Sequence, residues 1–329
     1  MKKISSLKGK SILTVKQLTP GEIQYLVDLA AQLKSKKKRG VRGNLLQRKN
    51  IALIFEKAST RTRCAFVVAA ADEGAHPDYL NTSDIHFGKK ESLADSARVL
   101  GRMFDGIAFR GYRHETVEGL ARHSGVPVWN GLTDIAHPTQ ILADLLTIQE
   151  HFGSLKGLTV VYMGDGRNNV ASSLMIGCVQ MGMHFVNCTP PELYPDRNLL
   201  AEAEGFAART GGSVRIVHVP EEAVAGANVI YTDVWVSMGE EAEFEKRRKL
   251  LGPYQVTMNL MRKTGNAESG KLIFLHCLPA FHDHETAVTR EIGAMEVTDE
   301  VFESAFSRVF DQAENRMHTI KAVMVATLT

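Results

Sequence analysis

Cysteine is scarce in this chain, and its four cysteines form no recognisable pair. They are Cys64, Cys178, Cys188 and Cys277, among 329 residues. No C-x-x-C motif is present, and the basic start of the chain is not followed by the apolar stretch of a secretory signal. We therefore expect free thiols in a cytoplasmic protein. Cys/His spacings typical of zinc sites are also missing, so we expect no metal ion.

Long apolar runs and a large net charge are absent as well. No run of 18 apolar residues occurs, so the sequence predicts no membrane-spanning helix. The formal net charge is +2, which is too small for a protein that binds nucleic acid mainly through bulk charge. The length of 329 residues suggests two domains, each large enough to bury its own core. We expect partners that are neither membranes nor nucleic acids.

Short apolar runs alternate with amphipathic segments along most of the chain. The runs that predict strands are 51–55, 105–109, 126–130, 158–163, 184–188, 213–217, 228–232, 272–276 and 306–310. Helical periodicity covers 92–103, 114–124, 138–151, 168–182, 197–209 and 312–327. Thr19 and Glu22 have the spacing of a capping box with Pro20 between them, so another helix is expected to begin there. The alternation predicts an α/β fold with mainly parallel sheets flanked by helices, and a domain boundary is expected at 153–157.

The most informative stretch is 59–63, which reads Ser-Thr-Arg-Thr-Arg. It lies between the strand-like run 51–55 and a helix-like run that starts at Cys64 and is closed by Gly74. A strand, a turn rich in hydroxyls and a helix start together favour an anion site, because backbone N–H groups and the positive end of the helix dipole face the ligand. Guanidinium groups add fork-shaped bonds that suit phosphate oxygens. A helix cap followed by surface arginines would also fit this stretch taken alone.

Further polar clusters follow other predicted strands or open helices. Ligands of open parallel sheets bind beyond the carboxyl ends of the strands, so these clusters are the candidate functional residues. They are Arg110, 137–140 (His-Pro-Thr-Gln), 164–169 (Gly-Asp-Gly-Arg-Asn-Asn), Asp233 with 235–239, 276–279 (His-Cys-Leu-Pro) and 314–316 (Glu-Asn-Arg). A dinucleotide site is disfavoured, because Asn169 stands where the third glycine of that fingerprint belongs.

With these motifs the chain resembles the aspartate/ornithine carbamoyltransferase family over nearly its whole length. Ser-Thr-Arg-Thr and His-Pro-Thr-Gln are similar to the family's carbamoyl-phosphate half, and 233–239 with His-Cys-Leu-Pro is similar to its ornithine-specific branch. The resemblance implies a carbamoyl-phosphate domain over 1–152, an ornithine domain over 153–312, and a last helix, 313–329, that packs back on the first domain. It also implies a homotrimer, or a multiple of trimers, with sites at subunit interfaces.

The resemblance also implies roles for individual residues. Carbamoyl phosphate would be held by Ser59, Thr60, Arg61, Thr62, His86, Arg110, His137, Gln140, Cys277, Leu278 and Arg316. L-Ornithine would be held by Asn169, Asp233, Ser237 and Met238. The catalytic set would be Arg110, His137, Asp233 and Cys277. His86 departs from the family pattern, which usually has Gln at this position in a loop that reaches the neighbouring subunit's site.

The implied reaction is direct attack of the side-chain amine of ornithine on the carbamoyl carbon, giving L-citrulline and phosphate. Arg110, His137 and Thr62 would stabilise the oxygen charge that develops, and positioning of the two substrates would supply much of the acceleration. Neither an organic cofactor nor a covalent intermediate at Cys277 is expected.

Two other functions fit the same motifs less well. A carbamoyltransferase for another amine, such as putrescine, is the alternative within the enzyme class, and Ser237 and Met238 favour an amino acid instead. A catalytically silent anion-binding protein would not need Arg61, Arg110, His137 and Cys277 together. The sequence does not distinguish a biosynthetic from a catabolic role in arginine metabolism.

Overall fold

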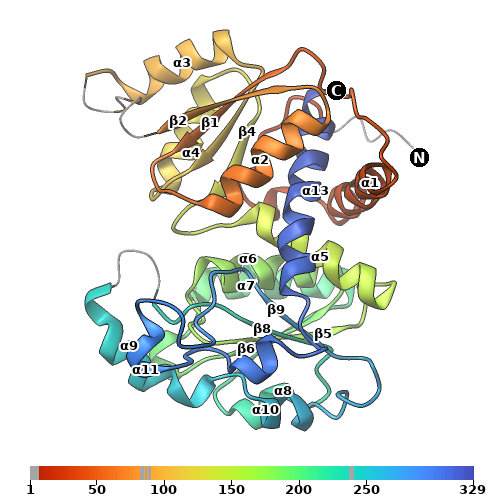
Figure 1. The fold of residues 1–329 in the computed structure, drawn as a ribbon, viewed down its shortest axis with the longest axis vertical. Coiled ribbons are helices and arrows are strands. Elements are labelled where there is room, and N and C mark those ends of the chain that lie inside the picture. The colour runs from red at the N-terminus through yellow and green to blue at the C-terminus, as the bar shows by residue number, and fades with distance from the viewer. Residues whose placement is uncertain (1–6, 82–84, 86, 88–89, 237–240) are drawn as a thin grey trace. The chain divides into compact units, whose positions relative to one another are not determined.

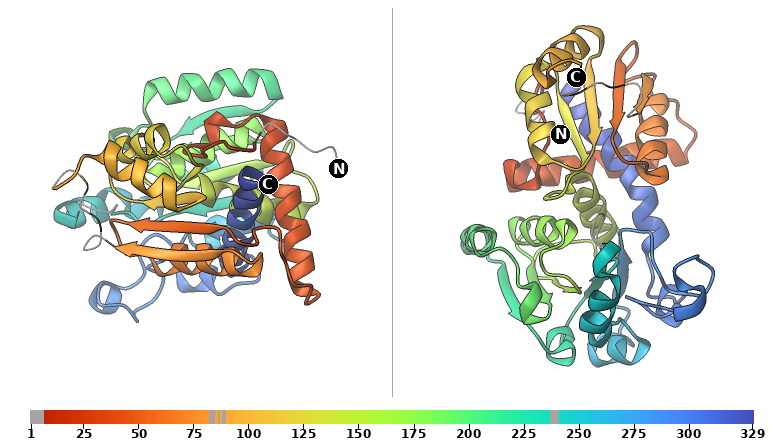
Figure 2. Two further views of the ribbon diagram at one scale, coloured as in Figure 1. Left: turned by 90° about the horizontal axis from the view of Figure 1, so that it is seen from above. Right: turned by 90° about the vertical axis from the view of Figure 1, so that its left-hand side faces the viewer.

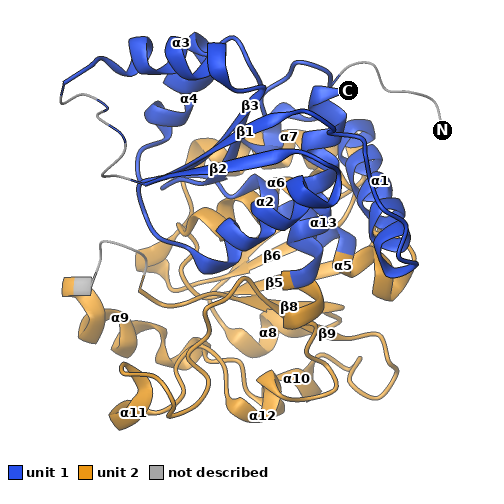
Figure 3. Cartoon of the chain, turned by 45° about the horizontal axis from the view of Figure 1, so that its top comes forward, with its two compact units in different colours: residues 1–146, 314–329 blue, residues 147–313 orange. Residues whose placement is uncertain are grey.

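The computed structural model describes residues 7–81, 85, 87, 90–236 and 241–329. They form two compact units, drawn in different colours in Figure 3. Unit 1 comprises residues 1–146 and 314–329, and unit 2 comprises residues 147–313. The predicted residues His86, Ser237 and Met238 lie outside the described residues. Within the described part, every helix is too short or too polar to cross a membrane.

Unit 1 is built on a four-stranded sheet in the order β2-β1-β3-β4, and every pairing is parallel (Figure 1). The strands are β1 (Asn50–Phe55), β2 (His76–Asn81), β3 (Gly106–Arg110) and β4 (Val128–Leu132). Side chains of β1, β3 and β4 are almost all buried, as expected for a parallel sheet covered on both faces. Ala52, Ile54, Ile107 and Phe109 pack with Val117 and Leu120 of a neighbouring helix into one apolar cluster.

The helices of unit 1 are α1 (Pro20–Lys38), α2 (Thr60–Asp72), α3 (Leu93–Met103), α4 (His114–His123) and most of α5 (Pro138–Phe152). Of these, α1, α2 and α3 each begin at a side-chain cap. The capping box at the start of α1 is confirmed: Glu22 N–H donates to Thr19 Oγ1 over 3.2 Å, and Thr19 N–H donates to Glu22 Oε2 over 2.8 Å. The basic residues Lys36, Lys37 and Lys38 close α1, where cations complement the helix dipole.

The last helix, α13 (Val309–Leu328), contributes residues 314–328 to unit 1 and runs beside α1 and α2 (Figure 2). Lys34 Nζ of α1 donates to Asn315 Oδ1 over 2.8 Å. Buried Lys321 Nζ donates to Asp72 Oδ2 of α2 over 2.7 Å. These polar contacts fix the depth and rotation of α13 in unit 1, and the expectation that the last helix packs on the N-terminal part of the chain is confirmed.

Unit 2 contains a five-stranded, fully parallel sheet in the order β7-β6-β5-β8-β9. Its strands are β5 (Thr159–Met163), β6 (His184–Cys188), β7 (Ser213–Val217), β8 (Val229–Thr232) and β9 (Ile273–His276). The helices are α6 (Asn169–Gln180), α7 (Arg197–Thr210), α8 (Pro220–Val224), α9 (Phe244–Leu251), α10 (Met258–Lys263), α11 (Thr289–Ile292) and α12 (Asp299–Phe302). Strand order reverses between β5 and β8, so the carboxyl ends of β5, β8 and β9 are the expected place for a ligand.

One strand was missed, and one predicted strand was wrong. Strand β2 was missed because its sequence, His-Pro-Asp-Tyr-Leu-Asn, is polar and contains Pro77; β2 is an edge strand, where proline and polar side chains are tolerated. The run 306–310 was expected to be a strand but forms only an isolated bridge between Ser307 and Phe274. Val309 then begins α13, since its apolar residues continue with helical spacing.

Candidate functional site

The turn between β1 and α2 forms a helix N-terminus with a side-chain cap. Ser59 is the N-cap of α2, and its Oγ accepts a hydrogen bond of 3.3 Å from Thr62 N–H. Thr60 and Arg61 lie exposed in the first turn, whereas Thr62 is fully buried. The helix dipole makes this end of the 13-residue helix favourable for an anion.

The hydroxyl of Thr62 joins three segments that are distant in the sequence. Arg110, at the end of β3, donates to Thr62 Oγ1 from Nη1 over 3.3 Å. Arg316, on α13, donates to the same oxygen from Nη2 over 2.7 Å. Ser59 Oγ donates to it over 3.1 Å. Both guanidinium groups are largely buried, so this site gathers two positive charges around one neutral oxygen.

An irregularity in the sheet makes room for this arrangement. Phe109 pairs with Asn130 whereas Arg110 pairs with Leu132, which leaves Gly131 as an extra residue in β4. A Cβ atom at Gly131 would lie 3.2 Å from the Phe109 carbonyl oxygen and 3.3 Å from Thr62 Cγ2. A side chain at this position would press on the end of β3 and on Thr62, so the glycine in the bulge lets the Thr62 side chain approach closely.

His137 is buried just before α5 and lies within the field of the same arginines. Burial, followed by the positive charges of Arg316, Arg110 and Arg61, holds the pKa of His137 well below its ordinary value. The imidazole is therefore neutral at physiological pH, with one ring nitrogen carrying a proton and the other able to accept one.

Gln140 lies three residues further along, in the first turn of α5. Its Nε2 donates to Asp144 Oδ1 over 2.8 Å. Its Oε1 is buried and has no hydrogen-bond partner among the described residues. A buried amide oxygen of this kind can accept a hydrogen bond from a ligand NH₂ group.

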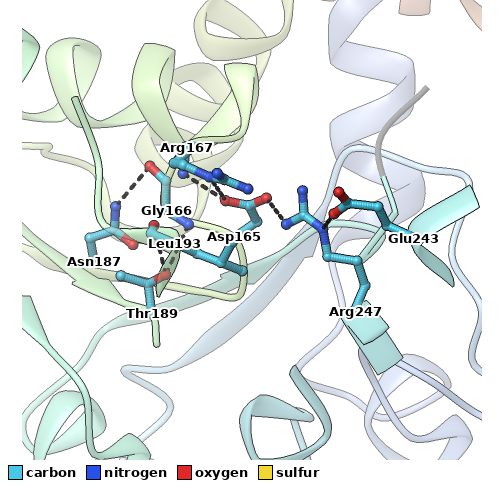
Figure 4. A network of polar contacts seen from close by, with 8 residues as sticks. All are labelled: Asp165, Gly166, Arg167, Asn187, Thr189, Leu193, Glu243 and Arg247. Atoms are coloured by element: carbon cyan, nitrogen blue, oxygen red, sulfur yellow. Dashed lines mark hydrogen bonds and ion pairs between the residues drawn. The ribbon is translucent and has the colours of Figure 1, made fainter. Parts of the chain in front are cut away.

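In unit 2 the loop between β5 and α6 is fixed by a polar network (Figure 4). Gly166 N–H donates to Thr189 Oγ1 over 3.0 Å, and Asn187 Nδ2 donates to the Gly166 carbonyl over 3.4 Å. A Cβ atom at Gly166 would lie 2.8 Å from the Leu193 carbonyl oxygen, so only glycine allows the loop to pack this closely.

The loop delivers Asn168 to the start of α6 and to the end of β8. Asn168 is the N-cap of α6: its Oδ1 accepts from Val170 N–H over 2.7 Å. Its Nδ2 donates to Asp233 Oδ2 over 3.1 Å. The predicted residue Asn169 is the first residue of α6 and is half-buried.

Asp233 and Cys277 meet at the carboxyl ends of β8 and β9. Cys277 Sγ donates to Asp233 Oδ1 over 3.0 Å, and Val234 N–H donates to the same oxygen over 2.8 Å. Asp233 is largely buried, and its carboxylate is satisfied by Asn168 on its other oxygen. A thiol and a carboxylate in contact can together orient an amine and accept its proton.

The backbone that carries Cys277 and Leu278 is held by the His276 ring. Leu278 N–H donates to His276 Nδ1 over 2.9 Å, so Nδ1 is the acceptor. The ring proton of the neutral imidazole therefore lies on Nε2, which is 3.1 Å from Glu296 Oε1. Both side chains are fully buried, and the pair fixes where the Cys277–Leu278 backbone points.

Two groups of described side chains are close enough to hold a metal ion, with potential ligand atoms within 4.8 Å of one another. One is Asp233, His276 and Cys277; the other is His282, Asp283 and Asp299. In the first group His276 already uses both ring nitrogens in hydrogen bonds. The expectation of a metal-free enzyme stays a prediction.

The structure thus brings many of the predicted residues into two sets. Ser59, Thr62, Arg110 and Arg316 are joined by hydrogen bonds in unit 1, with His137 in the field of the arginines. Asp233 and Cys277 are joined in unit 2. The sequence analysis included Asn168 in the candidate run 164–169 but assigned it no role. Glu296 follows no strand and carried no signal.

Two family models match the chain. The carbamoyl-phosphate-binding domain of aspartate/ornithine carbamoyltransferases matches residues 10–150. The aspartate/ornithine-binding domain of the same enzymes matches residues 156–327.

Individual relatives agree with this match. The catabolic ornithine carbamoyltransferase of Bacillus licheniformis is 58% identical over 100% of this chain and 99% of its own length. That of Bacillus thuringiensis is 60% identical over 98% of this chain and 97% of its own. The solved structure of ornithine carbamoyltransferase from Pyrococcus furiosus superposes with a TM-score of 0.90 at 45% identity, covering 98% of both chains. The chain therefore belongs to the aspartate/ornithine carbamoyltransferase family.

Proposed function

We propose that this chain transfers the carbamoyl group of carbamoyl phosphate to the side-chain amine of L-ornithine, giving L-citrulline and phosphate. The observation that carries the proposal is the gathering of Arg110 and Arg316 on the Thr62 hydroxyl beside the N-terminus of α2. Two buried guanidinium groups and a helix dipole favour a ligand with a dianionic phosphate. Relatives named ornithine carbamoyltransferase support the choice of the second substrate.

Residues of unit 1 would bind the phosphate and polarise the carbamoyl group. The first turn of α2, with Ser59, Thr60 and Arg61, faces the phosphate oxygens. Arg110, Thr62 and neutral His137 surround the carbamoyl oxygen, whose negative charge grows as the amine attacks. Because His137 is neutral, it can donate its single N–H to that oxygen without repelling the three arginines around it. Groups aimed in advance at a developing charge are each worth about 10²–10³ in rate.

The NH₂ part of the carbamoyl group would be recognised by hydrogen-bond acceptors of the protein. The buried Gln140 Oε1 is an acceptor for that group. The Leu278 carbonyl is a second acceptor in the proposed set, and Arg316 completes the anion contacts. These contacts distinguish a carbamoyl group, which has N–H donors, from an acetyl group, which has none.

Residues of unit 2 would bind ornithine. Asp233 and Asn169, with Ser237 and Met238, form the proposed binding set. The attacking amine must be neutral, and a free alkyl amine has a pKa of roughly 10.4, so under about 1% is neutral at pH 7. Asp233 and Cys277 orient the amine and receive its proton as the C–N bond forms. The C–O bond to the phosphate breaks, and phosphate leaves carrying the bonding electrons.

The close relatives are named catabolic, and we propose the same direction for this chain: phosphorolysis of citrulline to ornithine and carbamoyl phosphate. The same residues serve both directions, because forward and reverse reactions share one transition state. We further propose a cytoplasmic homotrimer or a multiple of it, in keeping with the family resemblance. Size-exclusion chromatography with light scattering measures this assembly directly.

A colorimetric assay for the ureido product tests the function. With carbamoyl phosphate and ornithine, citrulline and phosphate are expected in equal amounts, and putrescine at the same concentration is expected to give far less product. Asp233→Asn should abolish most transfer while leaving stabilisation of the protein by inorganic phosphate intact. Phosphate release without citrulline, or a preference for putrescine, would contradict the proposal.

A further inference from the structure

A buried ion pair lies beside the proposed ornithine site and plays no part in the reaction described above. Arg247 of α9 is 1% exposed and donates from Nη1 to Asp165 Oδ2, and Asp165 is 5% exposed (Figure 4). Arg247 Nε also donates to Glu243 Oε2 over 3.2 Å. Burying two charges costs about as much free energy as their attraction returns, so such a pair is weak evidence for a role in stability alone.

The second oxygen of Asp165 shapes the turn that follows β5. Asp165 Oδ1 accepts from Arg167 N–H over 2.9 Å, and the Asp165 carbonyl accepts from Asn168 N–H over 3.1 Å. A side-chain oxygen bonded to the N–H two residues later is an Asx-turn. Because Arg247 holds Oδ2, the carboxylate cannot rotate without losing either the ion pair with Arg247 or the hydrogen bond from Arg167 N–H.

The turn ends at Asn168, and Asn168 sets the carboxylate of Asp233. The amide of Asn168 makes both hydrogen bonds in one orientation alone, in which Oδ1 accepts from Val170 N–H and Nδ2 donates to Asp233 Oδ2. The opposite orientation would place oxygen against a carboxylate and NH₂ against an N–H group. Asp233 Oδ1 is then available to Cys277 and Val234. A continuous series of contacts therefore links Arg247 to the carboxylate proposed to hold the amine.

The loop has little freedom to compensate for a change at its start. Gly166 is bonded on both sides, through Thr189 Oγ1 and Asn187 Nδ2. Gly166 also packs tightly against Leu193, since a Cβ atom at Gly166 would lie 2.8 Å from the Leu193 carbonyl oxygen. A rotation of the Asp165 carboxylate would therefore displace Asn168.

We propose that Arg247 and Asp165 are positioning residues for ornithine, which act through the Asx-turn and Asn168 on the orientation of Asp233. The proposal rests on the proposed function of Asp233. Because the pair acts on Asp233 through the turn and Asn168, we expect its effect on the kinetics of the amine substrate. Loss of a residue that orients a functional side chain through hydrogen bonds typically lowers activity by about 10–100-fold.

Three variants separate positioning from plain stability. Arg247→Met leaves the Asp165 charge buried without its guanidinium, so both stability and ornithine kinetics should suffer. The double variant Arg247→Met with Asp165→Leu removes both charges, which often restores stability, but it also removes the Asx-turn acceptor. Arg248→Met is the matched control, because Arg248 is the next residue of α9 and makes an exposed pair with Glu245.

We expect the double variant to melt close to the parent protein, to keep kcat/KM for carbamoyl phosphate within about 2-fold, and to lose at least about 10-fold in kcat/KM for ornithine. Arg248→Met should match the parent in all three. A double variant that regains parental ornithine kinetics together with its stability would overturn the proposal, as would equal losses for the two substrates.

Asp165→Asn provides the same test if the double variant does not fold. Its NH₂ group must face either Arg167 N–H or the Arg247 guanidinium, so one of the two contacts is lost. A selective loss in ornithine kinetics is again expected, and unchanged ornithine kinetics would overturn the proposal. A parent protein that makes no citrulline would instead refute the proposed function, so the two failures are distinguishable.

Discussion

Thr62→Val removes one oxygen atom and should weaken both unit 1 and its proposed anion site. The substitution keeps the β-branched shape, so helix propensity and packing change little. It deletes the acceptor of the 2.7 Å bond from Arg316 and of the 3.3 Å bond from Arg110. Hydrogen bonds to charged groups contribute about 1.5–3 kcal/mol each, and the longer bond belongs at the low end.

The ligand-free protein should therefore lose about 2–4 kcal/mol in its free energy of unfolding, measured by urea denaturation. Addition of phosphate should recover part of this loss, because phosphate oxygens can accept from the two guanidinium groups that Thr62 no longer serves. The kcat/KM for carbamoyl phosphate should fall at least about 10-fold, which corresponds to ~1.4 kcal/mol.

Thr319→Val is the matched control. Thr319 is a fully buried threonine of α13, and among the described residues its hydroxyl donates only to the Asn315 and Arg316 carbonyls of its own helix. It should lose no more than about 1 kcal/mol, with unchanged kinetics. If Thr62→Val and Thr319→Val were indistinguishable in stability and in kcat/KM, the assignment of Thr62 as the junction of the anion site would be refuted.

Four further predictions concern the reaction and the stability of the protein. Arg61→Ala should lower kcat/KM for carbamoyl phosphate by at least about 100-fold, since Arg61 is expected to make more than one charged hydrogen bond to phosphate; near-normal turnover at low carbamoyl phosphate would argue against this. The KM for ornithine should fall as the pH rises from about 6 to 8.5, because only the neutral amine attacks. Cys277→Ser should slow turnover without abolishing it. A carbamoylated Cys277 found by mass spectrometry would contradict direct transfer. Burial lowers the pKa of His318 from 6.5 to about 4, so the unfolded chain binds the proton more tightly than the folded chain. The contribution of His318 to stability should therefore be full above pH 6.5 and decline toward pH 4. Urea denaturation at several pH values should show a shallower decline in the free energy of unfolding for His318→Gln, and the same decline in both proteins would show that His318 is not responsible.

The sequence was sufficient for most of the sheet and helix pattern but not for its edges. Central strands such as β1 and β5 carry apolar runs because both faces of a parallel sheet are covered. Strand β2 has no such run, since an edge strand with Pro77 pairs with one neighbour only. The short helices α8, α10, α11 and α12 were also missed, because a single turn or two is too short for a helical period to be recognised.

The candidate site, too, could be predicted only in part from the sequence. The residue types of the anion site could be read from the run 59–63, yet the meeting of Arg110 and Arg316 on one hydroxyl could not. These arginines are 48 and 254 positions away from Thr62, and only the folded chain joins them. Likewise, Arg247 looks like one basic residue among several in α9, and its burial against Asp165 depends on how α9 packs in unit 2.

The most direct test of the central claim follows one oxygen atom through the reaction. The experiment uses carbamoyl phosphate labelled with ¹⁸O in the oxygen that bridges carbon and phosphorus. It is incubated with ornithine, and the masses of citrulline and phosphate are measured by mass spectrometry. Attack of the amine on the carbamoyl carbon breaks the C–O bond, so all of the label should appear in phosphate and none in citrulline. Label in citrulline, or label in phosphate with no citrulline formed, would contradict carbamoyl transfer by this chain.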